Sequence, residues 1–294
     1  MPSIISAMSA AQIAALTTAQ MHSLSTADVQ ALSTEQVANL NSDQLGAISA
    51  SAIVTLSTAA VAALTSSQAV GLGTDDIAAL KTSQLAALDL GNLTSTQVGA
   101  LSSTQMATLS SAQTATLSTA EIAALGTAQI AALPTAGLKA MGSNQLQALG
   151  TAGIAVLKTS QIAALDLNKL SSSQVGAFSA AQVTALTTAQ AVSLSTAEIN
   201  ALSSAQASAL STGALKALGS DQLQALSTDN VAALKTSQIA ALDVTSLKSS
   251  QVGAFTTAQV GALNTTQVTA LSTAEIDALT TAQASALSTA ALKA

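Results

Sequence analysis

The sequence predicts an all-α fold: an elongated solenoid of very short capped helices, one in each eight-residue repeat, with a 77-residue superperiod. Three observations predict it. The phrase Ser-Thr-Ala-Glu-Ile-Ala-Ala-Leu at 118–125 recurs with small changes along the chain, as at 195–202 and 272–279. Most repeats open with a helix-capping signature. The apolar residues are nearly all Leu, Ile, Val and Ala, which suit a thin core built repeat by repeat.

The repeats can be followed through one column that usually holds Gln or an acidic residue. This column advances by eight residues from Gln12 to Gln84, and the next Gln is Gln97, thirteen residues on. Five residues are therefore inserted, and the inserts near 89–93, 166–170 and 243–247 start 77 residues apart. We interpret residues 1–294 as a single repeat array with blocks at about 81–157, 158–234 and an incomplete 235–294. Each insert is expected to make a bulge or phase shift in the coil.

A short helix is the conformation that one repeat favours. Ser118 as N-cap makes Glu121 the third helical residue, which gives the Ser-x-x-Glu capping box, with Leu117 and Ile122 at the positions of a hydrophobic staple. A continuous helix fails because the repeat needs about 4 residues per turn instead of 3.6, and a strand fails because the large apolar residues do not alternate. Where Lys81 or another non-capping residue stands first, the cap can shift to the following Thr or Ser. Such short helices persist only by stacking.

The composition excludes several classes of protein. Charged residues make up 7% of the chain, the net charge is −6 and arginine is absent, so no basic surface is available for nucleic acid. No apolar run approaches the ~18–20 residues of a membrane span, and no cleavable signal peptide is visible at the N-terminus. The absence of cysteine excludes disulfides and thiolate metal sites. The two aromatic residues, Phe178 and Phe255, are too few for an ordinary globular core.

The sequence offers no catalytic, cofactor-binding or metal-binding residues, and we expect neither an enzyme nor a cofactor. His22 is the single histidine and has no base or ligand partner near it in sequence, so we interpret it as a surface or cap residue. The many serines accordingly lack a histidine that could activate them. Asp75 and Asp76 do not have the spacing of a calcium loop and are better explained as charge compensation at a helix N-terminus.

The rare charges suggest ion pairs beside the inserts. If consecutive repeats stack in register, a lysine that opens one repeat projects beside the aspartate that opens the insert eight residues later. The predicted pairs are Lys81–Asp89, Lys158–Asp166 and Lys235–Asp243. An exposed pair contributes only ~0–1 kcal/mol, so these pairs would mark the geometry of the insert without holding the fold. The alternative is that both side chains are solvated and that the acid favours a helix start.

Two resemblances can be drawn from these motifs. The phrase Leu-Ser-Thr-Glu-Gln-Val at 32–37 is similar to the helix openings of TAL-type DNA-binding repeats. That likeness covers the capping signature alone; the repeat length, base-reading loop and basic charge differ, so it does not imply DNA binding. The whole chain resembles the Ala/Ser/Thr/Leu-rich, acidic, cysteine-free repeat arrays of large bacterial secreted and surface proteins, including adhesins and S-layer-like proteins. This resemblance implies an extracellular or cell-surface location and export without a cleaved N-terminal signal.

These observations favour a structural role. We expect a repeat protein that assembles head to tail into a filament, surface layer or matrix, because nearly identical repeats that do not close on themselves extend indefinitely. Its partners would be further copies of the chain and a cell surface or matrix, with no nucleic acid and no membrane span. The alternative is an adhesin stalk or a Ser/Thr-array protein that binds ice or glycans, which would require a flat and regular face of hydroxyl groups.

Overall fold

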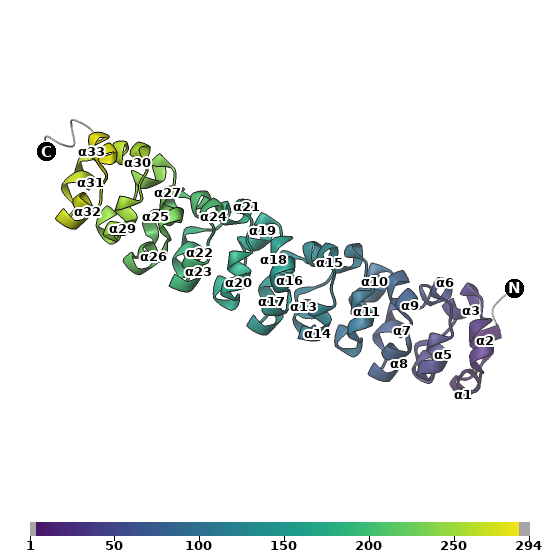
Figure 1. The fold of residues 1–294 in the computed structure, drawn as a ribbon. Helices are drawn as coiled ribbons and strands as arrows, with labels where there is room; N and C mark the ends of the chain where they lie inside the picture. Colours follow the sequence, from purple (N-terminus) through teal and green to yellow (C-terminus); the bar gives the residue numbers. More distant parts are fainter. Residues whose placement is uncertain (1–3, 288–294) are drawn as a thin grey trace. The chain divides into compact units, whose positions relative to one another are not determined.

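Short helices follow one another through the described chain (Figure 1). The computed structural model describes residues 4–287, and these hold 33 α-helices, four 3-10 helices and no strand. The α-helices have four to six residues each, and most begin eight residues after the previous one. The predicted all-α solenoid with one short helix per repeat is confirmed.

The contacts divide the chain into two compact units, residues 1–156 and 157–294, and the second begins one residue before the block predicted at 158–234. The elements of the first unit are η1 (Ile4–Ala7), α1 (Ala10–Ala14), α2 (Thr18–His22), α3 (Thr26–Gln30), α4 (Thr34–Ala38), α5 (Ser42–Gly46), α6 (Ala50–Ile53), α7 (Thr58–Ala62), α8 (Ser66–Gly71), α9 (Thr74–Ala79), α10 (Thr82–Ala87), η2 (Leu90–Asn92), α11 (Ser95–Gly99), α12 (Ser103–Met106), α13 (Ser111–Thr116), α14 (Thr119–Ala123), α15 (Thr127–Ala132), α16 (Thr135–Ala140), α17 (Ser143–Ala148) and α18 (Gly150–Ala155). Those of the second unit are α19 (Thr159–Ile162), η3 (Leu167–Lys169), α20 (Ser172–Gly176), α21 (Ala180–Thr184), α22 (Thr188–Ser193), α23 (Thr196–Asn200), α24 (Ser204–Ala209), α25 (Thr212–Ala217), α26 (Ser220–Ala225), α27 (Thr228–Ala232), α28 (Thr236–Ile239), η4 (Val244–Ser246), α29 (Ser249–Gly253), α30 (Thr257–Gly261), α31 (Thr265–Thr269), α32 (Thr273–Asp277) and α33 (Thr281–Ser285).

Three successive elements make one turn of the solenoid. Elements that pack closely are separated by two others along the chain: α1 packs on α4, α4 on α7 and, in the second unit, α20 on α23. Consecutive repeats therefore follow each other around one turn, and repeats three apart stack. The expectation that consecutive repeats stack in register is wrong.

Most helices begin at the predicted capping boxes, and α14 shows the arrangement. Ser118 is the N-cap of α14; its Oγ accepts the N–H of Glu121 at 3.2 Å, and the Glu121 carboxylate accepts the Ser118 N–H at 2.6 Å. Leu117 and Ile122 are buried, as the staple requires. Lys81 remains the N-cap of α10 although its side chain makes no capping bond, so the cap does not shift to the following threonine.

The inserts are shortened repeats. Asp89 caps η2, and its Oδ1 accepts the N–H of Gly91 at 3.1 Å, while Leu90 is fully buried. Because η2 packs on α8 and on α13, it fills one third of a turn as an α-helix does. Asp166 and Asp243 cap η3 and η4 in the same way. The predicted bulge or phase shift is wrong, because the order of three elements per turn continues through each insert.

Two apolar columns form the core of each unit. In α14 and its C-terminal link, Ile122 and Leu125 are 0% and 7% exposed. Phe178 and Phe255 occupy the Leu column in the second unit and are also buried. Burial of such a side chain stabilises by about 1.5–3 kcal/mol, whereas an isolated helix of five residues is unstable in water. Stacking between turns is therefore what keeps each helix folded.

Candidate functional site

A glutamine at the third helical position links each turn to the preceding one. Gln105 in α12 is 3% exposed, and its Oε1 accepts the Ser102 N–H at 2.7 Å. Its Nε2 donates to the carbonyl oxygens of Ile77 and Leu80, both at 2.9 Å. Ile77 lies in α9 and Leu80 directly before the N-cap of α10, so both belong to the preceding turn. One side chain thus caps its own helix and satisfies two carbonyls of the preceding turn.

This arrangement recurs in both units, and we call it the glutamine ladder. In each member Nε2 donates to carbonyl oxygens 25 to 31 residues earlier in the chain. Members include Gln36, Gln44, Gln68, Gln84, Gln97, Gln105, Gln113, Gln129 and Gln145 in the first unit and Gln182, Gln190, Gln206, Gln222, Gln238, Gln251, Gln259, Gln267 and Gln283 in the second. The sequence pattern predicts only a capping role for this column. The sequence did contain a signal for this second role of the amide. Glu serves in a capping box as well as Gln does, yet Gln is far commoner in this column.

Three buried glutamates interrupt the ladder. Glu121, Glu198 and Glu275 are 6%, 8% and 6% exposed, and each accepts the N–H of its own N-cap residue. An ionised carboxylate has no N–H to donate, so it cannot bind the carbonyls of the preceding turn. Their helices α14, α23 and α32 pack on α11, α20 and α29, which directly follow the three inserts. In each block one of these glutamates therefore breaks the ladder, above the helix that leaves the insert.

The predicted ion pairs do not form. Lys81 and Asp89 are the N-caps of α10 and η2, which follow each other around one turn instead of stacking. The three aspartates accept the backbone N–H two residues on, at 3.1–3.2 Å. The pKa of Asp243 is lowered, chiefly because the hydroxyl group of Thr245 donates a hydrogen bond to its carboxylate. Within residues 4–287, none of the three predicted ion pairs is present: Lys81–Asp89, Lys158–Asp166 and Lys235–Asp243.

His22 and the pair Asp75 and Asp76 lie on different helices. His22 ends α2 on the surface, with Nδ1 3.1 Å from the carbonyl oxygen of Ala47 at the C-cap of α5. Asp75 and Asp76 stand in the first turn of α9, where the Asp76 carboxylate accepts the Gly73 N–H at 2.9 Å. Burial raises the pKa of Asp76. In residues 4–287 no three His, Asp or Glu side chains are grouped so that they could hold a metal ion. Nor does this part contain a helix that is long and apolar enough to cross a membrane.

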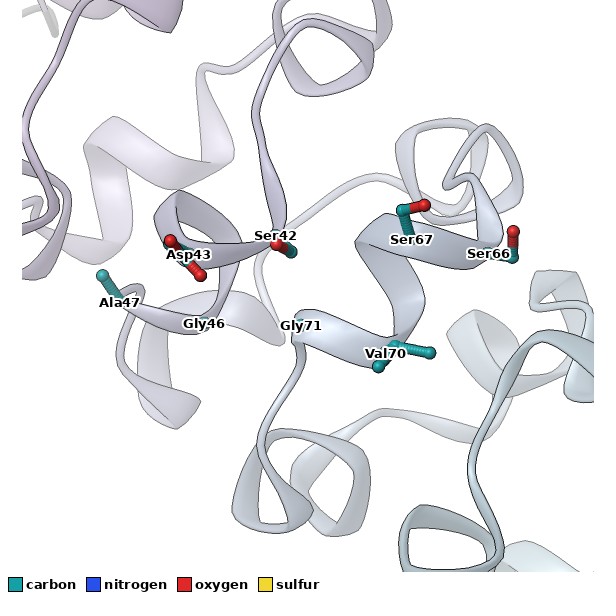
Figure 2. A pocket seen from close by; sticks show the side chains of 8 residues that line it. All are labelled: Ser42, Asp43, Gly46, Ala47, Ser66, Ser67, Val70 and Gly71. Atoms are coloured by element: carbon teal, nitrogen blue, oxygen red, sulfur yellow. The ribbon is translucent and has the colours of Figure 1, made fainter.

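A shallow groove of about 930 Å³ lies between α5 and α8 (Figure 2). Its lining is Ser42, Asp43, Gly46, Ala47, Ser66, Ser67, Val70 and Gly71. The two helices approach closely because Gly71 has no side chain: a Cβ there would lie 2.7 Å from the Cα of Ser42. Ala69 fills the buried position of this repeat, and Val70, the next residue, is 52% exposed. With Asp43 as the only ionisable side chain in the lining, the groove has no acid–base pair.

The repeats of this chain match a known family of repeats. The profile of the ALTTAQ repeat matches seven times, at residues 22–58, 37–74, 70–111, 130–167, 165–196, 212–244 and 243–273. The phrase itself stands at 15–20, 185–190 and 278–283, where it supplies the residues from the link before the helix to the glutamine at the third helical position. No curated protein matches the chain. The matches together cover 22–111, 130–196 and 212–273, which is well over half of the residues, so the chain belongs to the ALTTAQ repeat family.

Proposed function

We propose that the chain is a structural repeat protein whose coils extend head to tail into a filament, surface layer or matrix. The glutamine ladder supports this proposal. Its acceptors are backbone carbonyl groups, which every residue carries, so the contact between turns needs no particular side chain on the accepting turn. A turn of a second copy can be accepted by the same chemistry, and a head-to-tail contact that does not close produces a filament.

The donors for such a contact are present in the first described turn. Gln12 and Gln20 hold capping boxes through Oε1, but within residues 4–287 their Nε2 atoms donate to no carbonyl. They occupy the place from which Gln36 and Gln44 bind the turn before them. In the last described turn, Ile276 is 51% exposed at a position that is buried in most other repeats. These amides and this apolar side chain could each bind a further turn of the coil, and the proposal is that a second copy supplies such a turn.

Electron microscopy of the purified 294-residue chain tests the proposal. We expect filaments or sheets whose length increases with protein concentration. Gln12→Ala with Gln20→Ala should shorten them, because two amide donors are removed. Gln30→Ala is the matched control, since Gln30 is exposed and its side chain makes no hydrogen bond. Short particles of constant mass at every concentration would exclude self-assembly.

An extracellular or cell-surface location is part of the same proposal. Its support is the resemblance to the Ala/Ser/Thr/Leu-rich, acidic, cysteine-free repeat arrays of secreted and surface proteins. Fractionation of the source cells, with detection of the chain in the medium, at the surface and in the cytosol, decides the location. Recovery in the cytosol alone would reject it.

A row of threonines favours a second candidate, an array that binds ice or glycans. One stack of helices in the second unit, α22, α25, α28, α30 and α33, opens with an exposed threonine in every member. These are Thr188, Thr212, Thr236, Thr257 and Thr281, and their hydroxyl groups make no hydrogen bond in the described chain. Activity in ice-recrystallisation or glycan-array assays should fall when Thr212, Thr236 and Thr257 are each replaced by Val. It should not fall in Thr196→Val, which changes a threonine of another stack. Equal losses in the two variants would exclude this row as the binding surface.

A further inference from the structure

The link between α17 and α18 differs from every other link in residues 4–287. Leu149 alone separates the two helices, whereas two or more residues separate all other successive elements. Leu149 is helical, with φ −61° and ψ −22°, while the N-caps of the other α-helices are extended. Gly150, the next residue, is the only one of the described chain with a positive φ, 65°. This conformation favours glycine, so the link is suited to its sequence.

The repeat at 149–156 also lacks both bonds that anchor a helix start. No side chain caps α18, and Gly153 stands eight residues after Gln145, in the column that holds the ladder glutamine in other repeats. The neighbouring α17 likewise has a glycine N-cap, but Gln145 accepts the Gly142 N–H at 2.8 Å and donates to Leu117. The glycine at 150 therefore differs from the one at 142 in having no amide side chain to tie it.

Two other helices lack the same bonds and show what distinguishes α18. In α6 and α16 the third position is Ala52 or Gly137, and no side chain caps the helix. Both begin on an extended N-cap residue, Ser49 or Pro134, and proline fixes its own φ. Only α18 combines the missing bonds with a glycine at the start. Its buried side chain, Ile154, packs as in other repeats, so packing holds the helix without help from its start.

We propose that the repeat at 149–156 is the preset opening point of the first unit, where the coil unfolds locally before the rest of that unit. A helix start without a cap or amide anchor has few bonds to break, and glycine at 150 gains the most backbone freedom on opening. The equivalent repeat one block later shows the anchored alternative. There Ser227 Oγ accepts the Asn230 N–H at 3.0 Å, and Asn230 Nδ2 donates to Leu202 at 2.9 Å.

Hydrogen exchange of the full chain, resolved by peptide, tests the proposal. In the unmodified chain we expect amides of 151–155 to exchange at least about fivefold faster than those of α17 and α14, the factor that corresponds to the ~1 kcal/mol of one helix cap. Ser227→Gly with Asn230→Gly gives the equivalent repeat one block later the residues of 150 and 153, and it should speed the exchange of 228–232 by a similar factor. Ser203→Gly is the control, because Gln206 still ties that helix start through the N–H of residue 203 and the carbonyl of Gly176, and it should leave the exchange of 204–209 nearly unchanged.

The outcomes separate clearly. Exchange of 151–155 at or below the rate of α17 in the unmodified chain overturns the proposal whether or not the double variant folds. If the double variant folds and the exchange of 228–232 is unaltered, the missing cap and amide are not the cause, and the proposal fails as well. Fast exchange of 151–155, together with faster exchange of 228–232 in the double variant but not of 204–209 in Ser203→Gly, establishes the opening point.

Discussion

The octad around α14 and the insert around η2 perform the same task with different numbers of residues. Each begins on a side-chain cap, Ser118 or Asp89, and each buries a large apolar residue in the core, Ile122 or Leu90. The insert lacks the residues that form the rest of the α-helix and the position of the ladder glutamine. It nevertheless packs on the elements three before and three after it. The unit of this architecture is therefore one third of a turn, and eight residues is only its commonest length.

The strongest way to break this comparison is to place a charge in both cores. Ile122→Asp and Leu90→Asp each bury an unpaired carboxylate and should each lower the free energy of unfolding by several kcal/mol. Chemical denaturation of the two variants, followed by far-UV circular dichroism, measures the effect. A much smaller loss for Leu90→Asp would mean that the insert is a surface loop and not a shortened repeat.

The next largest effect should come from the group that the octad has and the insert lacks. Gln105→Ala removes a bond to the Ser102 N–H and two bonds to the carbonyls of Ile77 and Leu80. Because the carbonyl groups of Ile77 and Leu80 stay buried without this donor, we expect a loss of about 2–3 kcal/mol in the free energy of unfolding. Gln30→Ala, at an exposed glutamine without a side-chain bond, should change it by less than about 0.5 kcal/mol. Similar losses for the two variants would contradict a structural role for the ladder.

The comparison also explains how far the sequence could predict the structure. The capping box at Ser118 is local, so its residues and spacing were sufficient to predict the helix start. The number of repeats per turn depends on which distant repeats meet, and identical octads carry no mark of their partner. The second use of Gln105, through Nε2, joins residues 25 and 28 positions apart and is invisible to a local pattern. The prediction of a bulge or phase shift at the insert was wrong because five extra residues break the eight-residue period. That they form one third of a turn follows only from the contacts between turns.

A smaller effect should separate octads with an acid in the amide column from those with an amide. Burial holds the pKa of Asp76 above its usual value of 3.8. The folded state therefore binds this proton more tightly, so the contribution of Asp76 to stability is present below pH 3.8 and is lost as the pH rises through the raised pKa. Asp76→Asn keeps an oxygen for the Gly73 N–H and removes the charge. We expect the variant to be more stable at pH 7, with the difference vanishing near pH 3.

Unfolding curves of both proteins between pH 3 and pH 7 check this prediction. The variant should show a weaker dependence on pH than the unmodified chain across the window just above pH 3.8. Asp75→Asn is the matched control, because Asp75 lies beside Asp76 in the sequence but is exposed. A control that reproduces the whole change would assign the effect to net charge and not to the buried position.

The smallest expected effect concerns the two residues that open neighbouring elements, Lys81 before α10 and Asp89 before η2. Stacking of consecutive repeats would bring them together, whereas three elements per turn place them on successive parts of the same turn. A double-mutant cycle with Lys81→Ala and Asp89→Ala should give a coupling energy of about zero, within ~0.3–0.5 kcal/mol, as expected for sites that share no contact. Asp89→Ala alone should still cost about 1 kcal/mol, because its carboxylate caps η2 through the Gly91 N–H. A coupling clearly above this range that fades at high salt would restore the ion pair and require consecutive repeats to meet.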